Sequence, residues 1–148
     1  MHNSFENKLV IAIDFDGTLV EDCYPEIGSP KIFAFETLKE MIKSRHQLIL
    51  WTTRTGDQLK AAVDFCESHG VRFYAVNNSF PEERYDGQSS RKINCELFIS
   101  HRNLGGLKGW GEIWQDISAM ETTSNKKPGK DDRDNRTLIR KIFRFLGK

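Results

Sequence analysis

Two carboxylates, Asp14 and Asp16, stand one residue apart behind an apolar run and are followed by Gly17 and Thr18. The run, residues 9–13, predicts a buried strand that stops at a turn. Both carboxylates can therefore converge on one crevice, and open parallel sheets bind ligands outside the carboxyl ends of their strands. One carboxylate there can act as nucleophile or metal ligand while the other passes a proton. The alternative, a turn in which Asp caps the next element, explains two converging carboxylates less well.

Polar side chains also close the later apolar runs. Buried strands are predicted over residues 9–15, 47–52, 71–76 and 96–100. Helices are predicted between and after them, over 30–42, 57–69 and 110–120. The first helix is expected to start at Ser29-Pro30, a capping hydroxyl followed by Pro. Four sites at strand ends are expected to meet: Asp14 with Asp16, Thr52, Lys92, and Ser100 with His101.

Strands that alternate with helices predict an α/β fold, with a parallel sheet and helices on its faces. The 148 residues, 38% of them hydrophobic, suffice for one core domain. We assign residues 1–121 to this core, 122–135 to a flexible linker and 136–148 to a basic amphipathic helix. Segment 21–28 is expected to cover the crevice as a flap, and residues 77–90 to form a long functional or mobile loop.

The order of these residues resembles the haloacid dehalogenase-like (HAD) superfamily, whose members are mostly Mg²⁺-dependent phosphohydrolases. Its first motif, DxDGT, matches residues 14–18, its second a strand that ends at Thr52, and its third Lys92. The resemblance spans about residues 8–120 and is nearest to small, uncapped bacterial HAD-like hydrolases. It implies a three-layer Rossmann-like fold without a large cap domain.

The resemblance also implies a mechanism. Asp14 would attack phosphorus to give an aspartyl-phosphate, and Asp16 would protonate the leaving oxygen and then activate water. Thr52 and Lys92 would hold phosphoryl oxygens. Arg54 would clamp the substrate phosphate, although a surface Arg paired with Asp57 or Glu21 is equally compatible with the sequence. The function expected is phosphomonoesterase activity on a small phosphorylated substrate.

The fourth motif departs from the family pattern. The family holds Mg²⁺ with the first Asp's carboxylate, the second Asp's carbonyl and acidic residues after the last core strand, where this chain has Ser100 and His101. The candidate metal ligands are therefore Asp14, Asp16, Ser100 and His101, for Mg²⁺ or for Mn²⁺ or another divalent ion.

Three outcomes follow from this departure. The site holds Mg²⁺ weakly and turns over slowly, a loop carboxylate (Glu82, Glu83 or Asp86) restores it, or the chain is a non-catalytic relative that binds a phosphorylated ligand or a protein partner. Trp51, Trp110 and Trp114 are expected in the core rather than as substrate platforms.

Charge is distributed unevenly. Residues 1–125 hold 13 Lys and Arg against 18 Asp and Glu, whereas residues 126–148 hold nine against three. The basic segment can dock on the acidic body or a second copy, or make weak contact with a membrane surface, while nucleic acid is disfavoured. No run reaches the roughly 20 apolar residues of a membrane span. Three spaced cysteines and an N-terminus without signal-peptide features favour a cytoplasmic protein.

Overall fold

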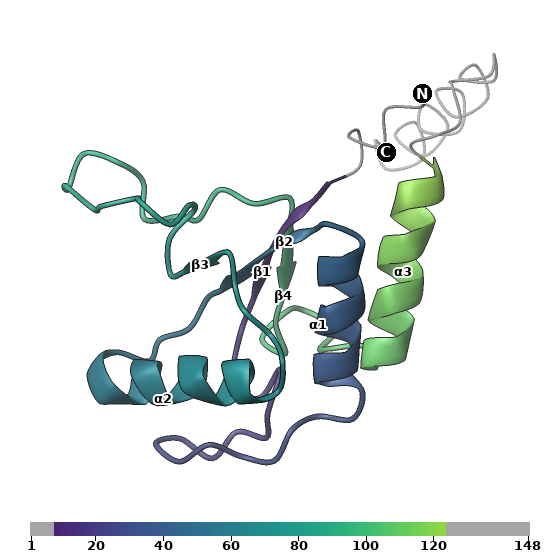
Figure 1. Cartoon of the computed structure of the whole chain (residues 1–148), viewed down its shortest axis with the longest axis horizontal. Coiled ribbons are helices and arrows are strands. Elements are labelled where there is room, and N and C mark those ends of the chain that lie inside the picture. The colour runs from purple at the N-terminus through teal and green to yellow at the C-terminus, as the bar shows by residue number, and fades with distance from the viewer. Residues whose placement is uncertain (1–7, 124–148) are drawn as a thin grey trace, which may run out of the picture. The chain divides into compact units, whose positions relative to one another are not determined.

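The computed structural model describes residues 8–123 (Figure 1). Its strands form one sheet in the order β3-β2-β1-β4, and every neighbouring pair is parallel. The strands are β1 (Val10–Ile13), β2 (Gln47–Leu50), β3 (Ala75–Val76) and β4 (Leu97–Ile99), and the helices are α1 (Ala34–Lys43), α2 (Gly56–Ser68) and α3 (Trp110–Thr123). The predicted α/β fold is confirmed, and within residues 8–123 no segment forms a large cap.

The chain divides into two compact units, residues 1–117 and 118–148. The candidate functional site described below belongs to the first. Of the predicted linker over 122–135, residues 122 and 123 are the end of α3, and the remainder lies outside the described residues, as does the predicted helix over 136–148.

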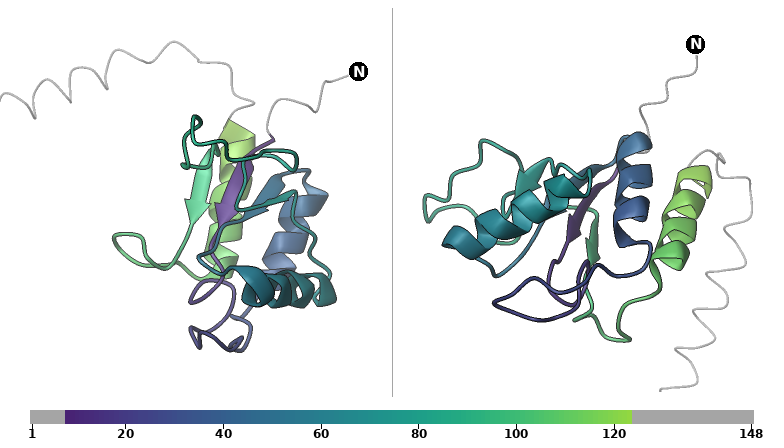
Figure 2. Two further views of the ribbon diagram at one scale, coloured as in Figure 1. Left: turned by 90° about the vertical axis from the view of Figure 1, so that its left-hand side faces the viewer. Right: turned by 60° about the horizontal axis from the view of Figure 1, so that its bottom comes forward.

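One face of the sheet packs against all three helices. Alternate strand residues, such as Ile11, Ile13 and Leu48, are fully buried in one cluster with side chains from α1, α2 and the first turns of α3. Helix α1 lies beside this part of α3 (Figures 1 and 2), and the Thr37 hydroxyl donates to the Trp110 carbonyl at 3.3 Å. Burial of these apolar side chains is the main stabilising term of the fold.

The other face of the sheet is covered by chain without helices. Ala12, Ile49 and Ala75 pack with Ile93, and Cys95 and Phe98 border this smaller cluster. Ile93 belongs to the long connection from β3 to β4, which is drawn in teal and green at the upper left of Figure 1. The layers are thus helices, sheet and a covering loop. One face of the sheet is packed against the three helices, and the other is covered by the connection from β3 to β4.

The predicted start of the first helix is wrong. Helix α1 begins at Ala34, after Phe33 in a left-handed conformation with φ 63°. The Glu21 amide donates to the Ser29 carbonyl and the Lys31 amide to the Leu19 carbonyl, each at 2.8 Å. This pairing holds residues 29–31 extended and overrides the local capping signal, so Ile32 and Phe33 are exposed rather than packed in the core.

The third strand is shorter than predicted. Only Ala75–Val76 pair with β2, because the Val71 amide donates back to the Cys66 carbonyl at 3.0 Å and continues the end of α2. The other strands stop one or two residues before their predicted ends. Helix α2 agrees closely with its prediction, and Gly70, with φ 80°, follows it.

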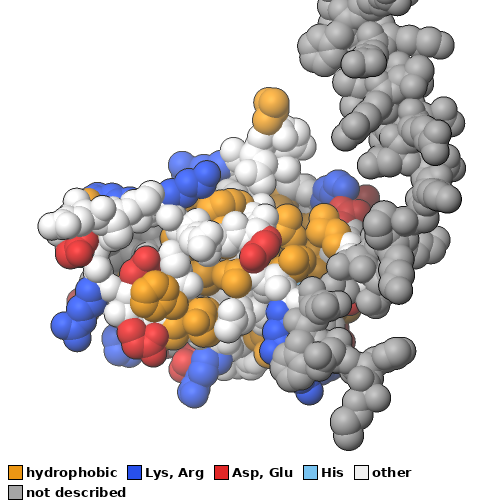
Figure 3. All heavy atoms as spheres, turned by 90° about the horizontal axis from the view of Figure 1, so that it is seen from above, with side chains coloured by type: hydrophobic (Ala, Val, Ile, Leu, Met, Phe, Trp, Pro, Cys, Tyr) orange, Lys and Arg blue, Asp and Glu red, His pale blue; other side chains and the backbone are white. Residues whose placement is uncertain are grey.

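Among residues 8–123 no helix is both long and apolar enough to cross a lipid bilayer. Figure 3 looks onto the molecule from above the view of Figure 1 and shows apolar side chains near the centre, with charged side chains of both signs around them. This mixture is ordinary for a protein surface, where apolar atoms are common.

Candidate active site at the carboxyl ends of the strands

The strand register sets Asp14, Trp51 and Ser100 in one row. Ile13 lies opposite both Leu50 and Ile99, so the next residue of each chain segment stands just beyond the sheet. Main-chain bonds extend the ladder there: the Asp14 amide donates to the Ile99 carbonyl at 3.0 Å and the Trp51 amide to the Ile13 carbonyl at 2.8 Å. The predicted meeting of the first and fourth motif positions is therefore observed.

The Asp14 carboxylate is held by its neighbours in the row. Its Oδ1 accepts the Phe15 amide at 2.8 Å, and its Oδ2 accepts the Ser100 hydroxyl at 2.9 Å. His101 Nδ1 lies 3.6 Å from the same Oδ2. The side chain is about 20% exposed. It is oriented and still reachable, which is what a nucleophile or a metal ligand requires.

Asp16 forms a bidentate ion pair with Arg54. Arg54 Nε donates to Oδ2 at 2.8 Å and Nη2 to Oδ1 at 2.7 Å, while further bonds run from Nη1 to the Pro25 carbonyl at 2.9 Å and from Nη2 to the Glu26 carbonyl at 2.8 Å. The guanidinium is buried, with 1% of the side chain exposed, and the bond to Asp16 raises its pKa against the opposing effect of burial. Such paired bonds fix orientation as well as charge.

The position of Arg54 differs from the predicted phosphate clamp. Its hydrogen bonds run to Asp16, Pro25 and Glu26 rather than to Asp57 or Glu21, and it does not line the cavity that Asp14 opens into. It instead ties segment 21–28, the expected flap, to the second carboxylate. Sequence reasoning missed this pair because 38 residues separate the partners.

Gly17 and Thr18 secure His101. The Thr18 hydroxyl accepts the His101 amide at 3.0 Å and lies 3.1 Å from His101 Nδ1. A Cβ on Gly17, which has φ 75°, would stand 2.6 Å from His101 Cε1. Only glycine therefore fits beneath this imidazole. Trp110 Nε1 donates to the Thr18 carbonyl at 3.1 Å and joins the motif to the start of α3.

Thr52 and Lys92 reach the same cavity as Asp14 and Asp16. Thr52 is anchored by its amide, which donates to Asn77 Oδ1 at 2.8 Å, and its hydroxyl accepts the Arg54 amide at 3.2 Å. Asn77, in a left-handed conformation with φ 53°, was not among the predicted site residues, although it directly follows β3. Lys92 is exposed on the covering connection.

The cavity has a volume of about 610 Å³, and much of its wall is apolar. Its lining residues are Asp14, Asp16, Trp51, Thr52, Thr53, Lys92, Phe98, Ser100, Arg102 and Asn103. Trp51 is 41% exposed, so the expectation of a core position is wrong for it, whereas Trp110 is buried as expected. Trp51 follows a strand whose last residues are buried, but its side chain borders the open cavity, and this accounts for the difference.

Two of the loop carboxylates accept hydrogen bonds from amides of their own loop. Glu83 accepts the Ser79 amide, and Asp86 accepts the amides of Gln88 and Ser89, which lowers the pKa of Asp86. Neither these two acids nor Glu82 lines the Asp14 cavity. Among residues 8–123 no group of three or more His, Cys, Asp or Glu side chains is arranged to hold a metal ion.

A conserved protein from Bacteroides thetaiotaomicron has a similar solved structure. The match has a TM-score of 0.73 and 46% sequence identity, and it covers 76% of this chain and 92% of that one. The chain belongs to the family of this Bacteroides protein. A scan against protein-family models gave no match, nor did a comparison with curated proteins.

Proposed function

We propose that this chain is a HAD-type phosphohydrolase that releases phosphate from a small phosphomonoester. The observation that carries the proposal is the pair Asp14 and Asp16 at the carboxyl end of β1, both open to a cavity that Thr52 and Lys92 also line. Two carboxylates of different environment in one crevice suit a division between nucleophile and proton carrier. The resemblance of residues 14–18, which contain this pair, to the DxDGT motif supports the same assignment.

The proposed reaction has two steps. An Asp14 oxygen attacks phosphorus, the ester P–O bond breaks, and the leaving oxygen takes a proton from Asp16, which must enter this step protonated and with one oxygen released from Arg54. Water then attacks the aspartyl-phosphate, gives its proton back to Asp16, and releases inorganic phosphate with Asp14 restored. For each transfer one Asp16 oxygen must exchange its bond to Arg54 for one to the substrate or water. Arg54 is therefore a positioning residue.

A phosphate dianion beside a carboxylate requires positive charge. Lys92 supplies one point charge and the Thr52 hydroxyl one donor. Asp14, Ser100 and the Asp16 carbonyl would hold a magnesium ion that keeps several of its waters, since such ions often use only one or two carboxylates. Such an ion, or Mn²⁺, would offset the repulsion between nucleophile and substrate. His101 is fixed by Thr18 next to Asp14, and it would favour a transition metal.

The first experiment measures phosphate release from p-nitrophenyl phosphate with Mg²⁺, Mn²⁺, Zn²⁺ and no metal. Wild type is expected to turn over and Asp14→Asn to be inactive, because the amide cannot form the acyl phosphate. Ser100→Asp is expected to raise both the rate and Mn²⁺ affinity, the latter followed by electron paramagnetic resonance without substrate. Equal rates for wild type and Asp14→Asn would overturn the proposal.

A second candidate is binding without turnover, of a phosphorylated ligand or a protein partner. The observation that favours it is the pair Ser100 and His101 beside Asp14, where phosphatases of the resembled family place acids. It is supported if phosphate binds and no substrate is consumed in wild type.

We also propose that the protein is cytoplasmic. This location agrees with its three free cysteines, Cys23, Cys66 and Cys95.

A further inference from the structure

Two aromatic rings on the wall of the Asp14 cavity have no role in the proposed phosphoryl transfer. Trp51 and Phe98 lie with ring centroids 4.9 Å apart at an interplanar angle of 58°. Both line the cavity, and Trp51 is 41% exposed. Single exposed apolar side chains are normal, but two rings in contact inside one cavity form a continuous aromatic surface, called here the aromatic wall.

The strand register explains why the wall stands beside the nucleophile. Ala12 lies opposite Ile49 on one side and Phe98 on the other, and the next row outward on this face holds Trp51, Asp14 and Ser100. Trp51 and Phe98 are thus diagonal neighbours across β1. The methyl of Ala12 is small enough for the rings to meet above it. A larger residue at this position would separate them.

The size of the cavity points to more than a phosphate. Its volume of about 610 Å³ falls within the roughly 300–1,000 Å³ of pockets that enclose small organic molecules. Asp14, Asp16, Thr52 and Lys92 serve the phosphoryl group. The aromatic wall is then free for the alcohol part of the ester, and Trp offers a large, stiff surface for a planar ring.

We propose that the substrate is a phosphate monoester that carries a planar aromatic group, stacked on Trp51 and Phe98 while its phosphoryl group lies at Asp14. This inference rests on the proposed function and names its substrate class. Trp51 is the specificity-determining residue, because it is the more exposed of the two rings and its loss leaves the sheet intact.

The test compares adenosine 5′-monophosphate with ribose 5-phosphate, which share the same ester bond and differ by the aromatic base. Wild-type phosphate release is measured for both with Mg²⁺ present. Binding of both is measured by calorimetry in an Asp14→Asn background, so that the ester is not consumed. We expect kcat/KM and affinity to favour the nucleotide by about tenfold or more, as stacking of one base on an aromatic side chain allows.

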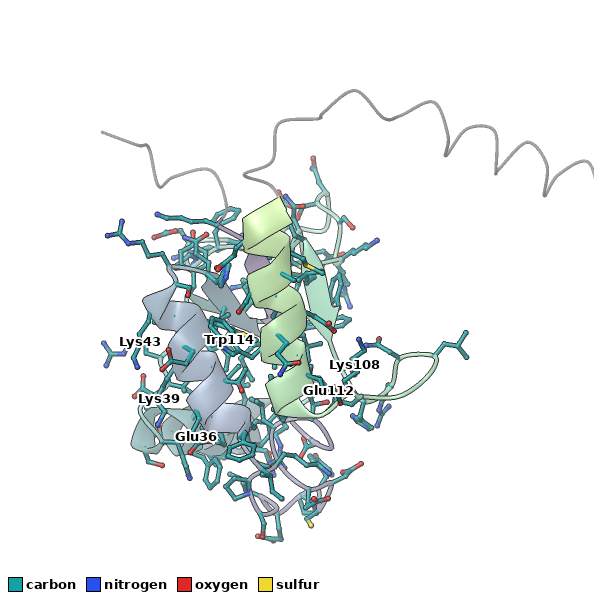
Figure 4. The ribbon with its side chains drawn as sticks, turned by 90° about the vertical axis from the view of Figure 1, so that its right-hand side faces the viewer. Glu36, Lys39, Lys43, Lys108, Glu112 and Trp114 are labelled. Carbon is teal, nitrogen blue, oxygen red and sulfur yellow. The ribbon has the colours of Figure 1, made fainter. Side chains whose placement is uncertain are left out.

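Trp51→Leu is expected to remove this preference by lowering kcat/KM and affinity for the nucleotide about tenfold, and Trp51→Phe to restore part of it. Trp114→Leu is the matched control. Trp114 projects from α3 toward α1, on the helical side (Figure 4), where it lines a groove with Phe33 and Lys39. Its substitution is expected to leave the preference unchanged.

The two proposals fail in different ways. Equal rates and equal affinities for the two esters would overturn the aromatic class and leave the phosphohydrolase in place. No phosphate release, together with nucleotide binding that Trp51→Leu weakens, would overturn the enzyme and keep the ligand class. A preference that survives Trp51→Leu would overturn the role of the aromatic wall.

Discussion

Arg54 places a permanent positive charge in the protein interior. Its guanidinium donates hydrogen bonds to one carboxylate and to two main-chain carbonyls. Burial of a charge is costly unless it is paired and hydrogen-bonded, and here both conditions hold. The Asp16 side chain is itself only 15% exposed. Removal of either partner therefore leaves the other desolvated and unpaired.

We expect Arg54→Met to lower the free energy of unfolding by about 3–5 kcal/mol, the usual cost of removing one partner from a buried pair. Lys60→Met is the control, because Lys60 and Asp64 form an exposed pair on α2 and such pairs contribute little. Urea unfolding measures both variants. Similar midpoints for the two would contradict the structural role of the Arg54 pair.

The same variant separates two roles of Arg54 in activity. A positioning residue for Asp16 predicts a lower kcat with KM little changed, whereas a phosphate clamp predicts a raised KM. Ribose 5-phosphate is the suitable substrate, since it leaves the aromatic wall empty. A rise in KM alone would return Arg54 to the role expected from the sequence.

At the scale of elements, helix α2 directs the side chain of Cys66 toward the sheet. Cys66 is fully buried in the cluster beneath β1 and β2, and burial raises the pKa of its thiol from 9.0 to about 12. In the unfolded chain the thiol ionises near its ordinary value, so the unfolded state loses a proton that the folded state keeps. Stability is therefore expected to fall as pH rises above 9.

The expected slope is about 1.4 kcal/mol per pH unit between roughly pH 9 and 12. It is measured as the difference between wild type and Cys66→Ala in urea unfolding at several pH values, because other groups titrate equally in both. Below about pH 8 the difference should become constant, at the offset that the lost side chain causes by itself. Parallel curves across this range would show that Cys66 ionises alike in folded and unfolded chains.

Local patterns sufficed to predict the strands that carry Asp14, Thr52 and Ser100, because buried runs and their closing polar residues are adjacent in the sequence. They failed at Ser29 and Pro30, where pairing with residues 19–21 outweighs a capping signal. They also failed for Trp51, whose exposure depends on how far the ladder continues, and for Arg54, whose partner is distant. The errors lie where contacts between remote segments decide.

At the scale of the whole molecule, every residue that lines the Asp14 cavity lies between positions 14 and 103, inside the unit of residues 1–117. The basic excess lies elsewhere, in residues 126–148. We therefore expect a chain that ends at residue 123 to keep the kcat/KM of the full chain on ribose 5-phosphate. Loss of phosphate release from a truncated chain with unchanged thermal unfolding would contradict this.

Substitutions on the two faces of the sheet are expected to have different effects. On the face covered by helices, side chains such as Ile11 and Leu48 are enclosed. A change of side-chain size there lowers the free energy of unfolding. On the opposite face, Trp51 is partly exposed, and Lys92 is exposed on the connection from β3 to β4, which contains no helix. Relatives of this chain could therefore diversify in ligand preference by changing that connection and the residue at position 51, while the scaffold beneath stays the same.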